Sequence, residues 1–252
     1  QILPKSLVKI FSKRYVAGIS NSEALKTIKQ LNLKKQSATI DILGEHTNFK
    51  NDCKTITEEY IEILHKIKNN HLDCNLSIKP SHIGADINYS IVLNNFKNIL
   101  MEASELKNFL RIDMESSKLT DTTIRLYNDL YQISNNVGIV LQAYLHRSEK
   151  DIKNLNKGSN IRLCKGIYKE SENIAYKDYN QINTNFIKIL KIAFEKGIYV
   201  GIATHDKTLI NSCIDLINSM NIQTDQFEFQ YLHGVPMKDM IKKYNDKNYK
   251  VR

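Results

Sequence analysis

The sequence predicts an α/β fold in which parallel strands close into a barrel of eight βα units. Short apolar runs alternate with longer amphipathic stretches along most of the chain, which is typical of strands alternating with helices. The length of 252 residues matches the about 250 residues usual for such a barrel. A doubly wound open sheet is the competing arrangement. However, no G-x-G-x-x-G motif follows a predicted strand, and the regular repetition favours the barrel.

Seven complete strands and the opening of an eighth can be located. Each is short and mostly apolar, as expected for a parallel sheet that is covered on both faces. The predicted strands are residues 38–45, 74–80, 110–115, 137–143, 160–166, 199–204 and 227–232, with the eighth opening at 249–252.

Amphipathic helices are predicted between these strands, at residues 120–134, 172–196, 207–220 and 236–244. Two further helices, 4–14 and 21–31, precede the first strand and would pack against or beneath the barrel. No linker rich in Pro, Gly or Ser interrupts the chain. We therefore expect one domain over residues 1–252, with an N-terminal helical segment in 1–35 and the barrel in 38–252.

Composition excludes several classes of protein. Hydrophobic residues make up 42% of the chain and charged residues 25%, an ordinary globular balance that argues against disorder. No apolar run approaches the roughly 18 residues of a membrane-spanning helix. The four cysteines form no C-x-x-C pair and fit no zinc module, so free thiols in a reducing compartment are expected.

The formal net charge is +9, yet only six of the 36 basic residues are arginine. The lysines are scattered along predicted helices, which favours solvated helix faces. Attraction to an anionic surface such as a membrane leaflet is the other explanation. A non-catalytic module that binds nucleic acid or acidic lipid stays open as an alternative, although the scattered lysines and the few arginines argue against it.

Polar residues stand at the end of all seven complete strands. In barrels of this class the catalytic groups lie at the C-terminal strand ends, so this pattern predicts an active site there. The residues are Asp41 and Glu45; Lys79; Asp113 and Glu115, with the apolar Met114 between them; Gln142; Arg162 and Lys165; Thr204, His205 and Asp206; and Glu228, Gln230 and His233.

Arg162 and Asp113 carry the sharpest signal among these residues. Arg162 interrupts an apolar strand, where an unpaired charge would cost several kcal/mol, so it requires a carboxylate or a ligand. Asp113, in another apolar strand, is its natural partner. Lys79, Arg162 and Lys165 would together line a cationic site suited to an anionic ligand, a carboxylate substrate or the negative locus of a reduced flavin.

Other chemistries on the same barrel stay open at this point. Lys79 or Lys165 could form a Schiff base, as in barrel aldolases. A carboxylate–metal isomerase is the other version, with Mg²⁺ or Mn²⁺ held by Asp113, Glu115, His205 and Glu228. His205 is equally well explained as a structural histidine. No H-x-H or H-E-x-x-H motif supports a hydrolytic zinc site.

Taken in order, the strand-end strings resemble the proline dehydrogenase family in its bacterial-type version. Any one string alone is a weak signal, but their order and placement are specific. The similarity spans the chain from about residue 15 to its end. The strings are TIDILGE (39–45), NLSIKPSHIGA (75–85), RIDME (111–115), VGIVLQAYLHR (137–147), RLCKGIYKE (162–170), ATHD (203–206) and EFQYLHG (228–234).

The resemblance implies an FAD-dependent flavoenzyme on a distorted (βα)₈ TIM barrel. Such an enzyme oxidises L-proline to Δ1-pyrroline-5-carboxylate, the first step of proline catabolism to glutamate. Hydride passes to flavin N5, and a quinone then accepts the electrons. The implied setting is cytoplasmic, with peripheral contact at the inner membrane. The implied enzyme has no metal and no nucleic-acid partner.

The resemblance also assigns roles to residues. Asp113 and Arg162 match the family's catalytic residues, and Lys79 matches the lysine that meets the substrate carboxylate. Tyr168 and Leu232 match residues that line the proline ring. Positions that contact FAD are matched by Met114, Gln142, Lys165, Gly166, Ile167, Thr204 and His205.

Some positions depart from the family pattern. Ile167 stands where Ala is frequent, Asp206 where Asn is frequent, and Lys169 and His233 replace common aromatic residues. The family also grips the substrate carboxylate with two arginines on the helix after strand eight, whereas this chain stops at Arg252. We therefore expect that last helix to be absent from the chain, with proline turnover weakened and FAD binding better preserved.

Overall fold

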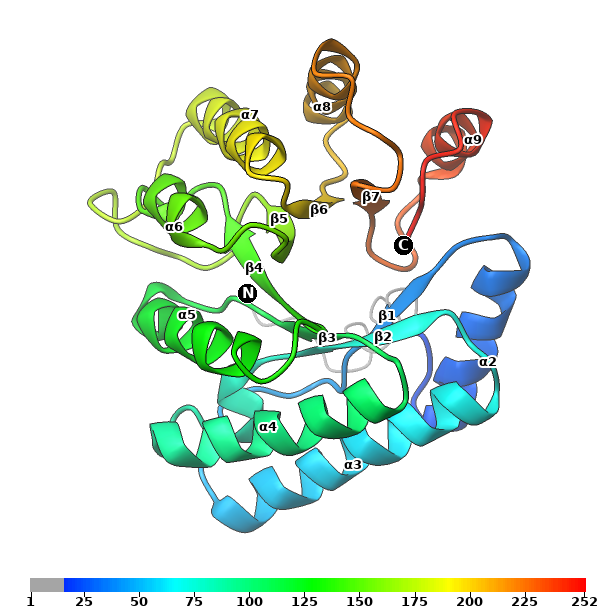
Figure 1. The fold of residues 1–252 in the computed structure, drawn as a ribbon, viewed down its shortest axis with the longest axis vertical. Coiled ribbons are helices and arrows are strands. Elements are labelled where there is room, and N and C mark those ends of the chain that lie inside the picture. Colours follow the sequence, from blue (N-terminus) through cyan, green and yellow to red (C-terminus); the bar gives the residue numbers. More distant parts are fainter. Residues whose placement is uncertain (1–15) are drawn as a thin grey trace, which may run out of the picture.

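The computed structural model describes residues 16–252, so the predicted helix 4–14 lies outside the described residues. Seven strands alternate with helices along this part of the chain (Figure 1). The strands are β1 (Ala38–Ile40), β2 (Cys74–Ile78), β3 (Leu110–Ile112), β4 (Val137–Gln142), β5 (Asn160–Cys164), β6 (Tyr199–Ala203) and β7 (Phe227–Gln230). The helices are α2 (Asn21–Leu33), α3 (Lys50–Asn69), α4 (Tyr89–Glu105), α5 (Ser117–Tyr131), α6 (Ser148–Asn154), α7 (Tyr179–Glu195), α8 (Lys207–Ser219) and α9 (Lys238–Asp246), with a 3₁₀ turn at Pro80–Ile83.

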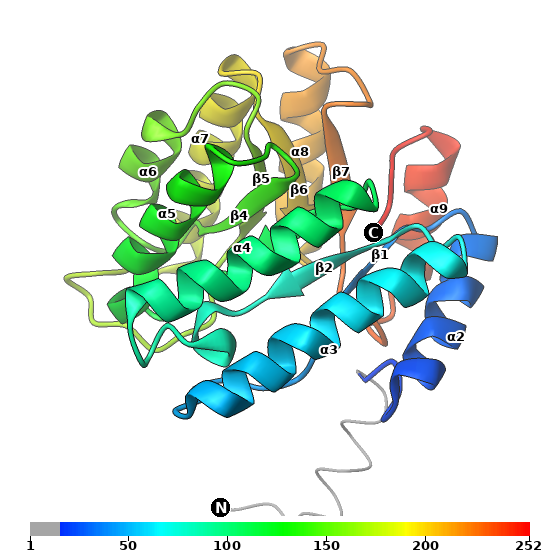
Figure 2. The same ribbon diagram turned by 60° about the horizontal axis from the view of Figure 1, so that its bottom comes forward.

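All seven strands are parallel, and each pairs with its neighbours in chain order from β1 to β7. The sheet curves, with helices outside it, and the chain's last residues lie between β7 and β1 (Figures 1 and 2). Val251 forms a parallel bridge to Phe229 of β7, and its carbonyl accepts a hydrogen bond from the Ser37 N–H just before β1. The predicted (βα)₈ class and the opening of an eighth strand are confirmed.

Side chains alternate between the two faces of each strand, and the two faces differ in chemistry. In β5, Ile161 and Leu163 are fully buried in the apolar core, while Arg162 between them reaches polar groups of β2 and of the residue that follows β3. The apolar core therefore lies between the strands and the helices. The barrel interior is lined by polar side chains that lead toward the C-terminal strand ends.

The start of α7 follows from capping. The predicted helix 172–196 begins at Tyr179 instead, because the Asp178 carboxylate caps the helix by accepting from the Gln181 N–H. Helices α3, α4 and α6 were not among the predicted elements, although buried residues of α3 such as Tyr60, Leu64 and Ile67 recur at helical spacing. Among residues 16–252, no helix has the length and apolar character that crossing a bilayer requires.

An ion pair holds the end of the chain to both edges of the sheet. The Arg252 guanidinium donates from Nε to Glu228 Oε1 of β7 at 2.7 Å. Its Nη1 donates to the Ala38 carbonyl of β1 and to Asn75 Oδ1 of β2, both at 2.7 Å. Glu228 is only 2% exposed, so its charge depends on this partner.

Replacement of Arg252 by Met is expected to lower the free energy of unfolding by about 3–5 kcal/mol, because the buried Glu228 carboxylate loses its hydrogen-bonded cation and keeps only the half-exposed Lys250, 3.6 Å away. Urea unfolding followed by circular dichroism measures the loss. The double variant Glu228→Gln/Arg252→Met serves as the control and should recover a large part of the stability. A single variant as stable as the wild type would show that this pair does not hold the barrel closed.

Candidate active site

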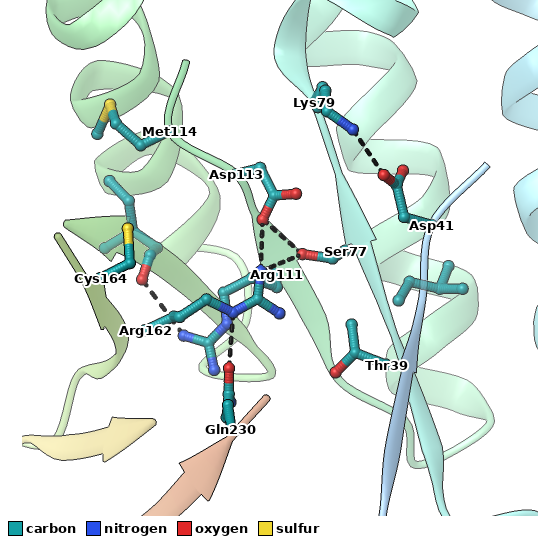
Figure 3. Close-up of polar contacts among 12 residues, drawn as sticks. Thr39, Asp41, Ser77, Lys79, Arg111, Asp113, Met114, Arg162, Cys164 and Gln230 are labelled. Atoms are coloured by element: carbon teal, nitrogen blue, oxygen red, sulfur yellow. Dashed lines mark hydrogen bonds and ion pairs between the residues drawn. The ribbon is translucent and has the colours of Figure 1, made fainter. Parts of the chain in front are cut away.

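An ion pair between β5 and the end of β3 lies at the centre of the polar interior (Figure 3). Arg162 Nη1 donates to Asp113 Oδ1 at 2.9 Å and to Ser77 Oγ of β2 at 3.1 Å. Ser77 in turn donates to the same Asp113 oxygen at 2.5 Å. The predicted partnership of Arg162 with Asp113 is confirmed. Both side chains stay slightly exposed, at 19% and 18%, so the pair is accessible from the strand ends.

A second ion pair joins the ends of β1 and β2. Lys79 Nζ donates to Asp41 Oδ2 at 2.6 Å, while Tyr60 of α3 donates to the other Asp41 oxygen at 3.0 Å. Burial alone would lower the pKa of Lys79, but the Asp41 carboxylate raises it above its ordinary value. Lys79 is therefore a fixed cation, and the neighbouring Asp113 strengthens this preference.

Lys165 and Asp206 form a third pair after β5 and β6. Lys165 Nζ donates to Asp206 Oδ2 at 2.5 Å and lies 4.2 Å from the centre of the Tyr179 ring. Tyr179 donates its hydroxyl to the same carboxylate. Burial opposes ionisation, but these hydrogen bonds hold the pKa of Asp206 well below its usual range. Asp206 also caps α8 through the Thr208 and Leu209 N–H groups, so helix and lysine share one anchor.

A buried amide and a glycine lie at the ends of β4 and β5. Gln142 is 2% exposed and donates to the Met114 carbonyl at 3.0 Å, while its Oε1 has no hydrogen-bond partner within residues 16–252. Gly166 adopts φ +114°, and a Cβ there would fall 2.1 Å from the Tyr144 ring. Gln142 Oε1 is therefore a buried acceptor that a ligand could use. The positive φ and the close Tyr144 ring together require glycine at position 166.

The remaining predicted site residues lie at the same end of the barrel. His205 Nε2 accepts the Leu232 N–H at 3.0 Å, which ties the loop after β6 to the loop after β7. Thr204 is buried and accepts from the Asp206 N–H. Ile167 and Leu232 are 86% and 66% exposed, so the structure leaves two large apolar side chains uncovered beside the charged groups.

Tyr168 lies near acidic groups of the same strand ends. Burial, with the nearby Glu45, Glu115 and Asp113 carboxylates, raises the pKa of its hydroxyl above the ordinary value. The phenol is therefore neutral at working pH. It offers a half-buried aromatic face beside the acidic groups.

Three contributors to this site were missed from the sequence. Ser77 bridges Asp113 and Arg162, Tyr60 holds Asp41, and Arg111 is buried in the interior, where it donates to Asn160 Oδ1 at 2.7 Å. Gly138 of β4 leaves space for the Arg111 side chain, since a Cβ at this position would lie 2.6 Å from Arg111 Nη1. Arg111 could have been found from the sequence, because it interrupts a predicted apolar strand in the same way as Arg162.

A sequence profile of the proline dehydrogenase family matches residues 24–252. The chain belongs to the proline dehydrogenase family. Proline dehydrogenase 2 of Bacillus subtilis (strain 168) is 35% identical over 228 residues, which cover 90% of this chain and 75% of that protein. Proline dehydrogenase of Deinococcus radiodurans is 29% identical over 247 residues, covering 96% of this chain and 79% of the relative.

The fold is also that of larger proteins. The structure of proline utilization A (PutA) from Bdellovibrio bacteriovorus, inactivated by N-propargylglycine, superposes with a TM-score of 0.88 at 22% identity. The match covers 98% of this chain and 31% of that one, so this chain spans about a third of the PutA chain. Membership of the family identifies the chain as a proline dehydrogenase enzyme, and the family in general uses a flavin cofactor.

The residues of the alternative Mg²⁺ or Mn²⁺ site, Asp113, Glu115, His205 and Glu228, each bind other groups of the protein. Asp113 is bound to Arg162, Glu115 accepts two hydrogen bonds from Ser81, and Glu228 is bound to Arg252. In the part of the chain that the structure describes, the group with metal-ligand spacing is Glu45, His46 and Glu115, and Asp86 holds the His46 ring at 2.8 Å. Acidic groups of this kind are common without an ion.

Replacement of Gly166 by Ala is expected to lower the free energy of unfolding by about 2 kcal/mol or more, because the positive φ and the Tyr144 ring both oppose a Cβ. Thermal unfolding followed by circular dichroism measures this. Gly158 is the matched control. It also has positive φ (+79°), but a Cβ there meets nothing closer than the Tyr131 hydroxyl at 4.0 Å. Equal losses in both variants would contradict a close packing role for Gly166.

Proposed function

We propose that this protein oxidises L-proline to Δ1-pyrroline-5-carboxylate with FAD as its cofactor and a quinone as the electron acceptor. The observation that carries the proposal is the Arg162–Asp113 pair, fixed at 2.9 Å beside Lys79 at the C-terminal strand ends of a family barrel. Residues 1–252 would act as one barrel domain. We place it in the cytoplasm, as the resemblance implies, and its net charge of +9 suits peripheral contact with an anionic inner membrane.

The residues present fit a flavin. A buried acceptor at the end of β4, Gln142 Oε1, lacks a partner in the described residues. FAD would supply the oxidant, taking a hydride equivalent from the ring carbon next to nitrogen. The residues that would hold it are Met114, Gln142, Lys165, Gly166, Ile167, Thr204 and His205.

Arg162 would provide a fixed positive charge where negative charge develops during the reaction. Preorganised cations in a water-poor site lower the cost of such charge without reorganising during the step. Asp113 and Ser77 hold Arg162 from one side, so its guanidinium is already in place before a ligand arrives. Asp113 thus organises the charged network.

Lys79 would bind the carboxylate of proline. Its ammonium is kept protonated and is oriented by Asp41, which leaves the remaining N–H groups for an incoming anion. The exposed Leu232 and the half-buried Tyr168 would cover the apolar ring. A charged end and an apolar wall together suit a small cyclic amino acid.

The structure argues against a Schiff-base aldolase. A lysine nucleophile must be neutral, which requires a lowered pKa. Lys79 instead has a raised pKa beside Asp41, and Lys165 is ion-paired with Asp206. Neither lysine has the environment of an amine nucleophile.

The purified protein should be yellow, and anaerobic addition of L-proline should bleach the flavin absorbance because electrons move from substrate to cofactor. Stopped-flow absorbance gives the rate of bleaching. Asp113→Asn keeps the shape of the side chain but removes the charge that orders Arg162. We expect it to retain the flavin and to slow bleaching by about 10²-fold or more. A colourless protein that borohydride traps with a carbonyl substrate would overturn the proposal.

Lys79→Met is expected to raise KM for proline by about 10-fold or more while changing kcat much less, because a carboxylate contact is made equally in the ground and transition states. Steady-state kinetics with a dye acceptor separate the two constants. Lys97, on the distant helix α4, gives the control variant Lys97→Met, which should leave both constants unchanged. A fall in kcat with constant KM in Lys79→Met would instead place Lys79 at the reacting atoms.

A further inference from the structure

Strand β7 places two polar side chains next to the Arg162–Asp113 pair, and the proposed function gives neither of them a role. Gln230 Oε1 accepts a hydrogen bond from Arg162 Nε at 2.7 Å. Gln230 Nε2 donates to Glu228 Oε1 at 2.6 Å. Both side chains are buried, at 7% and 2% exposure, so water cannot readily replace these partners. Figure 3 shows Gln230 meeting Arg162 on the side away from Asp113.

The orientation of the Gln230 amide follows from its two neighbours. Arg162 can only donate, and an ionised carboxylate can only accept. Gln230 therefore satisfies both partners in one orientation, with its oxygen toward Arg162 and its nitrogen toward Glu228. Turning the amide over would set donor against donor and acceptor against acceptor inside the barrel.

Glu228 is held and charged. Arg252 donates to it at 2.7 Å, and Lys250 Nζ lies 3.6 Å away. Burial alone would raise the pKa of Glu228, but Arg252 and the hydrogen bonds bring it down to about 2. Glu228 is thus an acceptor at any working pH, and its side chain is tied through Arg252 to β1 and β2.

Strand β6 leaves space for this arrangement. A Cβ at Gly201 would lie 2.4 Å from Gln230 Nε2. Glycine at this position therefore allows the amide to lie flat against β6 between Arg162 and Glu228. A glycine inside a strand is otherwise unfavourable, and it marks a point where another group approaches closely.

We propose that Glu228 and Gln230 are positioning residues, which fix the rotation of the Arg162 guanidinium from the side opposite Asp113. With Nε held by Gln230 and Nη1 held by Asp113 and Ser77, the guanidinium plane has one orientation. Arg162 Nη2 makes no hydrogen bond to other residues in 16–252, so its donors are free to meet a ligand. This inference rests on the proposed function for the role of Arg162.

A charge exchange tests the proposal. Glu228→Gln removes the charge that sets the Gln230 amide, and Gln230→Glu places two carboxylates at hydrogen-bond distance. The double variant Glu228→Gln/Gln230→Glu restores one carboxylate and one amide. Its amide nitrogen at 228 can donate to the new carboxylate, which again accepts from Arg162, while the amide oxygen accepts from Arg252.

Nitrogen-15 NMR reads the orientation of Arg162 without any activity. The chain has six arginines, so a labelled sample gives few Nε–H signals, and Arg162→Lys identifies the one that matters. We expect the Arg162 Nε–H to exchange with solvent about 10-fold faster or more in each single variant, and at nearly the wild-type rate in the double variant. Circular dichroism of each variant shows that it is folded.

The rate of flavin bleaching by L-proline is the second measurement. Each single variant should slow it by about 10- to 100-fold, and the double variant should return to within about 3-fold of the wild type, because misplaced catalytic groups cost rate steeply. Tyr231→Phe, at the residue directly after β7, is the control. It loses only a hydrogen bond to Gln36 Oε1 and should keep the wild-type rate.

The outcomes separate the two proposals. Single variants with wild-type exchange and wild-type bleaching would overturn the positioning role, as would a double variant no better than the singles in both measurements. If the exchange pattern appears as expected but L-proline never bleaches the wild-type protein, the orientation by β7 stands and the proposed function fails.

Discussion

The ion pair between Arg162 and Asp113 is the interaction on which the rest of the barrel interior depends. A guanidinium and a carboxylate are held between β5 and β3, with Ser77 bonded to both. Such a pair is costly to desolvate, and it is tolerated only when further hydrogen bonds satisfy the remaining donors and acceptors. The polar side chains on neighbouring strands follow from this requirement.

The need for a hydrogen-bond partner passes from one buried polar group to the next around the barrel. Arg162 needs an acceptor for Nε, which is Gln230; the Gln230 nitrogen needs an acceptor, which is Glu228; and Glu228 needs a cation, which is Arg252. Arg252 then donates to β1 and β2, where the chain of contacts closes. Barrel closure and the geometry of the site are thus parts of one hydrogen-bonded system. The apolar core outside the strands supplies cohesion but no orientation for Arg162.

Much of this could be predicted from the sequence, and the reason is energetic. An arginine inside the apolar run of β5 has few acceptable environments, so Arg162 and its partner Asp113 could be inferred from the cost of an unpaired charge alone. The strand positions followed from apolar runs and turn residues. The start of α7 did not, because Asp178 competes with earlier residues as a cap and its advantage depends on the loop before it.

The partners of other groups were beyond the reach of the sequence. Which side chains meet inside a barrel depends on the stagger of its strands, as when Lys79 after β2 meets Asp41 after β1 and Arg111 of β3 reaches Asn160 of β5. The glycines that allow such close contacts can be recognised only once the structure is known. Nothing in the sequence shows why glycine is needed at 138 and 201. The structure shows it, because Arg111 and Gln230 occupy the space where a Cβ would lie.

The interior also holds a buried cation that has no ion-pair partner among the described residues. Lys79, Arg162 and Arg252 each have a carboxylate partner, whereas Arg111 is bound only to neutral acceptors of β4 and β5 in the described structure. Burial and the nearby Arg162 lower the pKa of Arg111 to about 9, yet at neutral pH it stays charged. A buried cation without an ion-pair partner favours negative charge in its surroundings. A site placed above it favours a ligand that brings negative charge, and an amino-acid carboxylate does so.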